Sequence, residues 1–120
     1  MKILFGFGDV LTLDAWLAFF EQKGHEVDGA MSGEDLLGVA GDFKPDLLVL
    51  EHKLNGEVDG LGVFYELSAD PTTSDTKLIL VTELSNEDRK KMNKKFVQSA
   101  GILDVIRPSE LSFEAVEELI

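Results

Sequence analysis

Four side chains that could carry chemistry each follow closely on a short apolar run. Glu51 comes directly after LLVL, Thr82 after LILV and Arg107 after VI, while Asp9 lies two residues beyond the first run. Carboxylates such as those of Asp9 and Glu51 are ligands that Mg²⁺ accepts. A guanidinium such as that of Arg107 binds a carboxylate through two parallel hydrogen bonds. These groups could therefore hold a metal ion or form an internal ion pair, depending on where the chain places them.

The elements that must position these groups are five apolar runs that we predict to be β-strands. They cover residues 2–7, 25–30, 46–51, 77–82 and 102–106. Continuous apolar strands of this length are typical of a parallel sheet that is covered on both faces. In such a sheet, sites lie beyond the carboxyl ends of the strands. This rule selects positions 7–9, 51–53, 82–83 and 107 as the candidate site.

Segments with helical periodicity separate the predicted strands. Leu13, Trp16, Leu17 and Phe20 recur at the spacing of one apolar helix face, and Gly24 ends this helix. Further helices are predicted over 33–41, 60–69 and 86–99 and from about residue 112, the first of them opened by Ser32 and Asp35 as a capping box. Alternation of strand and helix through five rounds predicts one α/β domain over residues 1–120, a doubly wound three-layer sandwich.

Length and composition narrow the class of protein. The chain has 120 residues, which suits one domain, and its 44% hydrophobic and 28% charged residues are typical of a folded protein. It has no cysteine, which excludes disulfide and thiolate chemistry and favours a reducing compartment, the cytoplasm. A net charge of -12 opposes binding to nucleic acid or to an anionic membrane. The apolar runs are also far shorter than the roughly 18 residues of a membrane span.

Two further patterns are weak indicators of a site. Gly6 and Gly8 lie between a strand and a helix, as in a dinucleotide-binding fingerprint, but Leu11 stands at the third glycine position. A tight turn explains these glycines equally well. The two histidines, His25 and His52, are interpreted as surface residues, and the order of elements suggests no Ser-His-Asp set.

Five motifs in order resemble the receiver domain of response regulators. They are ILFGFGD, KPDLLVLE, DGLGVFYELSADP, LILVTE and VIRP, and together they span essentially the whole chain. The resemblance implies a flavodoxin-like (βα)5 sandwich with the parallel strand order 2-1-3-4-5. It also implies two-component signalling, in which a histidine kinase passes a phosphoryl group to an aspartate at the end of the third strand with the help of Mg²⁺. The resemblance also implies a cis bond before Pro108, whereas the ordinary statistics of bonds before proline favour trans.

This sequence departs from the receiver pattern at most positions to which the resemblance assigns a function. Phe7 and Gly8 stand where the family has an acidic pair, Glu51 replaces the phosphoacceptor aspartate, Arg107 replaces a lysine, and only Thr82 is retained. Neither Phe7 nor Gly8 has a side-chain oxygen for a metal ion. The loop from 51 to 60 is one residue longer than the common pattern.

Three parts of the candidate site have alternative interpretations. Asp9 could supply one metal ligand or could cap the helix that follows it. Glu51 carries its oxygens roughly 1.5 Å further than aspartate does, an offset that can disrupt in-line attack. Its carboxylate could form a fixed ion pair with Arg107 in place of ion and phosphate, or both groups could point into solvent. The aromatic readout position of the family's fifth strand holds Asp104, or Val105 if one residue has been deleted.

A basic cluster lies in the predicted fourth helix. Five of the 11 basic residues fall within seven positions, namely Arg89, Lys90, Lys91, Lys94 and Lys95. The cluster is either a solvated helix face or a docking surface for an acidic partner, including the acidic side of a second copy. In the resembled family, the face of helix four, strand five and helix five is the usual output and dimer surface, which favours docking.

The hypothesis that follows is a pseudo-receiver. It is a non-enzymatic module that uses no cofactor or metal and binds a protein partner in one fixed conformation, without phosphorylation. The alternatives are a working phosphotransfer receiver, in which Asp9 and Glu51 hold a metal and another side chain accepts phosphate, and a small cofactor-binding module on the same fold. The short last helix leaves open whether an output domain follows Ile120.

Overall fold

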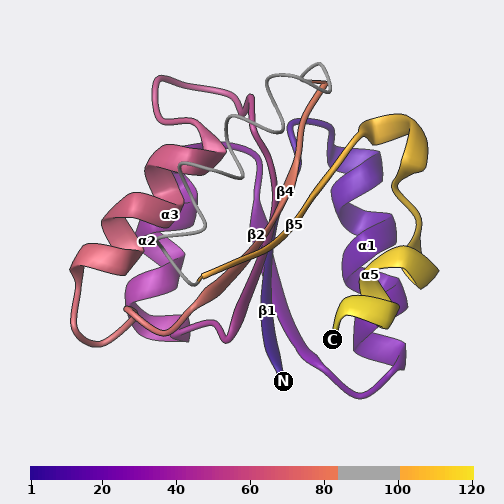
Figure 1. Ribbon diagram of the computed structural model, residues 1–120, viewed down its shortest axis with the longest axis horizontal. Coiled ribbons are helices and arrows are strands. Elements are labelled where there is room, and N and C mark those ends of the chain that lie inside the picture. Colours follow the sequence, from indigo (N-terminus) through magenta and orange to yellow (C-terminus); the bar gives the residue numbers. More distant parts are fainter. Residues whose placement is uncertain (84–100) are drawn as a thin grey trace.

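A computed structural model describes residues 1–83 and 101–120 and has the predicted flavodoxin-like architecture (Figure 1). Five parallel strands form one sheet in the order β2-β1-β3-β4-β5, which confirms the expected order. The strands are β1 (Lys2–Gly6), β2 (Glu26–Ala30), β3 (Leu47–Glu51), β4 (Lys77–Val81) and β5 (Ile102–Ile106). Their bounds differ from the predicted ones by at most one residue at either end.

The described helices are α1 (Val10–Gln22), α2 (Gly33–Phe43), α3 (Gly60–Ala69) and α5 (Phe113–Leu119), with a 3-10 turn at Pro108–Glu110. Each α-helix begins after a polar residue whose side chain accepts a backbone N–H three positions later, which satisfies one of the free donors at a helix start. These caps are Asp9, Ser32, Asp59 and Ser112. The cap predicted at Ser32 is confirmed, while the helix predicted over 86–99 lies outside the described residues.

Alternation along the strands divides the core into two layers, one on each face of the sheet. Ile3 and Phe5 of β1 pack on the side of α1 and α5, whereas Leu4 packs on the side of α2 and α3. Figure 1 shows these two helix pairs on opposite faces. The central strand β3 is buried from Leu47 to Leu50, as expected for a parallel strand covered on both sides.

Aromatic side chains dominate the layer beneath α1 and α5. The Trp16 ring stacks on Phe7 and on Phe20, with centroids 5.4 and 5.8 Å apart, and it meets the edge of Phe113 at 4.7 Å. Contacts of this kind contribute about 0.5–1.5 kcal/mol each beyond simple burial. Through Phe113, this cluster fastens the short α5 to α1 and to the end of β1.

Candidate functional site

The carboxyl ends of β1, β3 and β4 meet at one edge of the sheet, and the candidate residues follow them. The β3–β4 register pairs Glu51 with Val81, so the next residues, His52 and Thr82, lie side by side. A cavity of about 380 Å³ opens at this edge. Its lining includes Glu51, His52, Thr82 and Glu83, with Pro108 from the segment after β5. The topology therefore gathers side chains from separate parts of the sequence into one site.

Phe7 is a core residue and not a pocket residue, which corrects its predicted place in the site. Its side chain is only 1% exposed and packs in the same layer as Ile3 and Phe5. The reason is the two-residue period of a strand, which sends every second side chain to the same face. The position therefore supplies no group to the site. Gly8, the next residue, lies at the sheet edge and offers only its backbone.

The Glu51 side chain turns toward Gly8. Glu51 Oε1 accepts a hydrogen bond from the Gly8 N–H at 2.8 Å, and Asn55 Nδ2 donates to the Gly8 carbonyl at 3.2 Å. The backbone N–H and the carbonyl of Gly8 are thus both bound, by residues at and after the end of β3. The Glu51 carboxylate is placed by its contact with Gly8, and the ion pair between Glu51 and Arg107 stays a prediction.

Asp9 caps α1, the second of its two predicted roles. Its Oδ2 accepts hydrogen bonds from Thr12 Oγ1 at 2.8 Å and from the Thr12 N–H at 2.9 Å. The Thr12 hydroxyl and then the Thr12 N–H lower the pKa of Asp9, because both bonds favour the charged carboxylate. The Asp9 carboxylate therefore serves as the N-cap of α1.

The Mg²⁺ that the resemblance implies does not fit the residues present. Magnesium requires a near-octahedral set of hard oxygen ligands, yet Phe7 is buried in the core and Gly8 has no side chain. The carboxylates of Glu51 and Asp9 are already engaged by N–H and O–H donors. Across 1–83 and 101–120, no group of three or more His, Cys, Asp or Glu side chains is placed to hold a metal ion.

The loop between β3 and α3 is held to the start of α2 by Glu34. Glu34 Oε1 accepts the backbone N–H groups of Glu57 and Val58, both at 2.9 Å. Hydrogen bonds from its own N–H and from those of Val58 and Glu57 lower the pKa of Glu34. The Asn55 N–H also donates to the carbonyl of Met31 at 3.1 Å. We call the two hydrogen bonds accepted by Glu34 the clamp. The sequence did not predict it, although the extra residue in the loop from 51 to 60 indicated that this loop is unusual.

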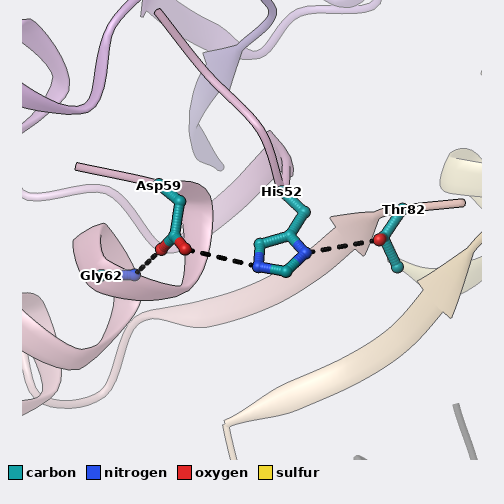
Figure 2. A network of polar contacts seen from close by, with 4 residues as sticks. All are labelled: His52, Asp59, Gly62 and Thr82. Atoms are coloured by element: carbon teal, nitrogen blue, oxygen red, sulfur yellow. Dashed lines mark hydrogen bonds and ion pairs between the residues drawn. The ribbon is translucent and has the colours of Figure 1, made fainter. Parts of the chain in front are cut away.

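His52 lies between Thr82 and Asp59, as Figure 2 shows. His52 Nδ1 is 3.4 Å from Thr82 Oγ1, and His52 Nε2 is 3.4 Å from Asp59 Oδ2. The other Asp59 oxygen accepts the Gly62 N–H at 2.7 Å, as the cap of α3. Figure 2 shows the imidazole spanning the space between the start of α3 and the end of β4.

The His52 side chain, interpreted as a surface residue, is half-buried at 23% exposure and has a polar partner on each ring nitrogen. The structure also brings together a Thr-His-Asp set that the order of elements did not suggest. Two signals could have revealed it. His52 and Thr82 each follow the last residue of a neighbouring strand, and Asp59 stands directly before the helix predicted over 60–69.

The segment after β5 contributes Arg107 and Pro108 to the same edge. The Thr82 N–H donates to the Ile106 carbonyl at 3.0 Å, which joins the end of β4 to the end of β5. The Arg107–Pro108 bond is trans, as ordinary statistics favour and not as the resemblance implies; no cis peptide occurs in the described ranges. At the readout position of β5, Asp104 is exposed and Val105 is buried.

The predicted partner-binding residues lie outside the described residues. They are Arg89, Lys90, Lys91, Lys94 and Lys95. The neighbouring β5 and α5, which belong to the same predicted face, are described. On α5, Glu114 and Glu118 are exposed.

Comparison with known proteins identifies the fold. No protein-family model matches the sequence, and no curated protein matches it. Solved structures match it closely in shape. The N-terminal domain of a response regulator receiver protein from Methanoculleus marisnigri superposes with a TM-score of 0.73 at 23% identity, covering 99% of this chain and 95% of that one.

Two further structures give the same result. A chemotaxis response regulator of Vibrio cholerae has a TM-score of 0.77 at 15% identity, with 99% and 98% of the two chains covered. A response regulator receiver domain from Francisella has a TM-score of 0.77 at 19% identity, with 98% and 92% covered. The chain thus has the fold of receiver domains. Among its described helices, none is long and apolar enough to cross a membrane.

Proposed function

We propose that this chain is a receiver-like signalling module that binds a protein partner without being phosphorylated and catalyses no reaction. Its fold, shared with receiver domains over their full length, supports a place in two-component signalling. The observation that carries the proposal is the contact of Glu51 with the Gly8 N–H. At the position of the phosphoacceptor, a carboxylate is bound to the backbone of the residue that stands in place of a metal ligand.

Phosphoryl transfer is disfavoured at this edge by electrostatics. The transition state spreads negative charge over the oxygens of the transferred group, and catalysis depends on positive charge placed against it. Here Glu51 and Glu83 line the cavity. Among the lining residues that the structure describes, Lys53 is the one lysine or arginine that can balance their negative charge. Without a dication between them, an incoming phosphoryl group meets carboxylates of its own sign.

One fixed conformation is supported by the contacts around the loop after β3. Asn55 holds the loop to Gly8 and to Met31, and Glu34 holds it to α2. These bonds connect the loop to the segment after β1, at Gly8, and to the segment after β2, at Met31 and Glu34. The loop after β3 is therefore held in one position at this edge of the sheet.

The partner we propose is a protein with an acidic docking surface. The cluster from Arg89 to Lys95 is the main concentration of positive charge in a chain of net charge -12, so it offers the complementary potential that steers an acidic partner. The exposed acids of α5 make a second copy of this chain one such partner. The same net charge argues against nucleic acid and anionic membranes, and we propose a cytoplasmic location on the absence of cysteine.

Intact mass spectrometry tests the absence of phosphorylation. The protein is incubated with acetyl phosphate and Mg²⁺ and then weighed, and we expect no gain of a phosphoryl mass. The matched variant combines Gly8→Asp with Glu51→Asp, which restores two carboxylates of the receiver pattern. A stoichiometric phosphoryl gain in the unaltered protein would overturn the proposal, and a gain confined to the variant would assign the block to these two positions.

Charge reversal tests the docking surface. Lys90→Glu with Lys94→Glu is compared in a pull-down with Lys23→Glu and Lys44→Glu, which change the net charge equally at exposed positions elsewhere. We expect the first pair to lose partner capture and the second to keep it. Equal loss in both pairs would show that net charge, and not the cluster, governs binding.

A further inference from the structure

A chain of polar contacts at the sheet edge links three separate elements. Asp59 belongs to the start of α3, His52 to the end of β3 and Thr82 to the end of β4 (Figure 2). The Asp59 carboxylate is anchored by the Gly62 N–H, so it presents Oδ2 to the imidazole from a fixed position. The function proposed above assigns no role to His52.

The two contacts favour one tautomer of a neutral His52. A carboxylate can only accept hydrogen bonds, so Asp59 requires the ring proton on Nε2. Nδ1 then carries a lone pair and accepts the hydroxyl proton of Thr82. In this state each group of the chain has the partner it needs, and the Thr82 O–H points toward the ring.

A second proton on the ring reverses one of these bonds. Imidazole is the side chain that ordinarily changes charge between about pH 5 and 8, and in its charged form both nitrogens are donors. The contact with Asp59 is then retained as an ion pair. The contact with Thr82 requires the hydroxyl to accept, so its proton must turn to another acceptor. Because Thr82 is 6% exposed, that turn takes place in a largely buried setting.

Thr82 also contacts the end of β5. Its N–H is bonded to the Ile106 carbonyl at the end of β5, and it lines a cavity that Pro108, after β5, also lines. Thr82 therefore joins His52 to the strand that borders the proposed docking face.

The charged groups around His52 are mainly acidic. Asp59 contacts the ring directly, Glu51 and Lys53 flank it along the chain, and Glu83 lines the same cavity from the end of β4. Arg107 precedes the Pro108 that closes the cavity from the segment after β5. From α3, Tyr65 faces Asp59; burial and then the charge of Asp59 raise the pKa of Tyr65, so it is neutral across this range.

We infer that His52 is a proton-operated switch for the Thr82 hydroxyl, so that pH, and not phosphate, sets the state of this site. The inference rests on the proposed function, since it supplies an input to a receiver-like site that is not phosphorylated. It requires no new ligand, only the reversal of one hydrogen bond within a chain of three residues.

Nuclear magnetic resonance of the full chain between about pH 5 and 8 tests the switch. The ring signals of His52 and the methyl and amide signals of Thr82 are followed together. We expect the signals of both residues to change together, with one shared midpoint. Thr82 signals that stay constant while His52 titrates would overturn the inference.

Two variants make the assignment specific. His52→Gln retains a polar side chain that does not titrate, so the pH dependence of Thr82 should disappear. Should that variant fail to fold, Asp59→Asn preserves an N-cap side chain and should move the midpoints of His52 and Thr82 together. Independent movement of the two midpoints, or a pH response of Thr82 that survives in His52→Gln, contradicts the switch.

The two proposals fail separately. A phosphoryl gain in the intact protein would remove the proposed function and leave the shared titration as a property of the site. A constant Thr82 would remove the switch and leave the phosphorylation result unchanged.

Discussion

Phe7 and Gly8 are neighbours in sequence but have opposite surroundings. The Phe7 ring is buried against Trp16, whereas Gly8 lies at the sheet edge, where a Cβ atom would meet nothing closer than Asn55 Oδ1 at 3.8 Å. Among the described glycines, Gly24 and Gly56 have positive φ, so the backbone of Gly8 suits any residue. An acidic pair can therefore be rebuilt at only one of these two positions.

We predict that Phe7→Asp lowers the free energy of unfolding by at least about 3 kcal/mol, because it empties an aromatic site and buries a carboxylate. Gly8→Asp should lower it by about 1 kcal/mol, because the new Cβ meets Asn55 and Glu51 only at ordinary van der Waals distance while the new carboxylate adds like charge beside Glu51. Urea unfolding followed by circular dichroism measures both. Similar losses in the two variants would contradict the burial that separates them.

At this scale the sequence predicted which residues meet but not how they bond. The strand-end rule placed Glu51 and Thr82 at one edge of the sheet, where they line the same cavity, because it depends only on which apolar runs form parallel strands. It could not show that Glu51 turns to Gly8 or that His52 turns to Thr82. Those contacts depend on rotamers and on the path of the loop after β3, which local periodicity does not encode.

The loop between β3 and α3 is held against α2 by one carboxylate, that of Glu34. Glu34 accepts two successive N–H groups, and Gly56, with φ of 85°, makes the turn before them. A carboxylate bonded in this way has a lowered pKa in the folded protein. Its contribution to stability is therefore present above the ordinary value of 4.5 and is lost as pH falls through the lowered folded value.

We predict that Glu34→Gln reduces the hydrogen-exchange protection of the Glu57 and Val58 amides several-fold at neutral pH, because a neutral acceptor forms weaker bonds than a carboxylate. The variant should also lose part of the decrease in stability that the unaltered protein shows below about pH 4.5. Asp35→Asn, which removes a charge from the same helical turn, is the control. Unchanged protection of both amides in Glu34→Gln would contradict the clamp.

Element types and their order were predictable because strand runs and helix periods alternate without interruption. The bounds of α3 were predicted at both ends, since Asp59 caps it and Asp70 stands directly before Pro71. The short α5 was predicted from near Ser112, which caps it, to Ile120, one residue past its observed end. The attachment of α5 to α1 depends on Phe113 meeting Phe19 and Trp16, a contact between distant parts of the chain.

Charge acts on the molecule as a whole. With a net charge of -12, the folded chain repels itself, and this repulsion is released on unfolding. At about 0.01 M salt the screening length is roughly 30 Å, similar to the diameter of a domain of this size, and it falls to about 10 Å at 0.1 M. Salt should therefore stabilise this protein even without binding to a particular site.

We predict that raising NaCl from about 0.01 to 0.3 M raises the Tm by several degrees, which corresponds to about 1 kcal/mol for a domain of this length. Thermal unfolding followed by circular dichroism gives the shift. Glu114→Lys with Glu118→Lys, which reduces the negative charge on α5, should show a smaller rise. A Tm that is constant or falls with salt would mean that local ion pairs outweigh the overall repulsion.

The aromatic cluster beneath α1 also provides an optical reporter. Trp16 is the only tryptophan in the chain, and its indole touches both the end of β1, through Phe7, and α5, through Phe113. Its fluorescence therefore responds to undocking of the C-terminal helix without any attached dye. Emission wavelength and quenching by acrylamide can follow that helix while the sheet remains folded.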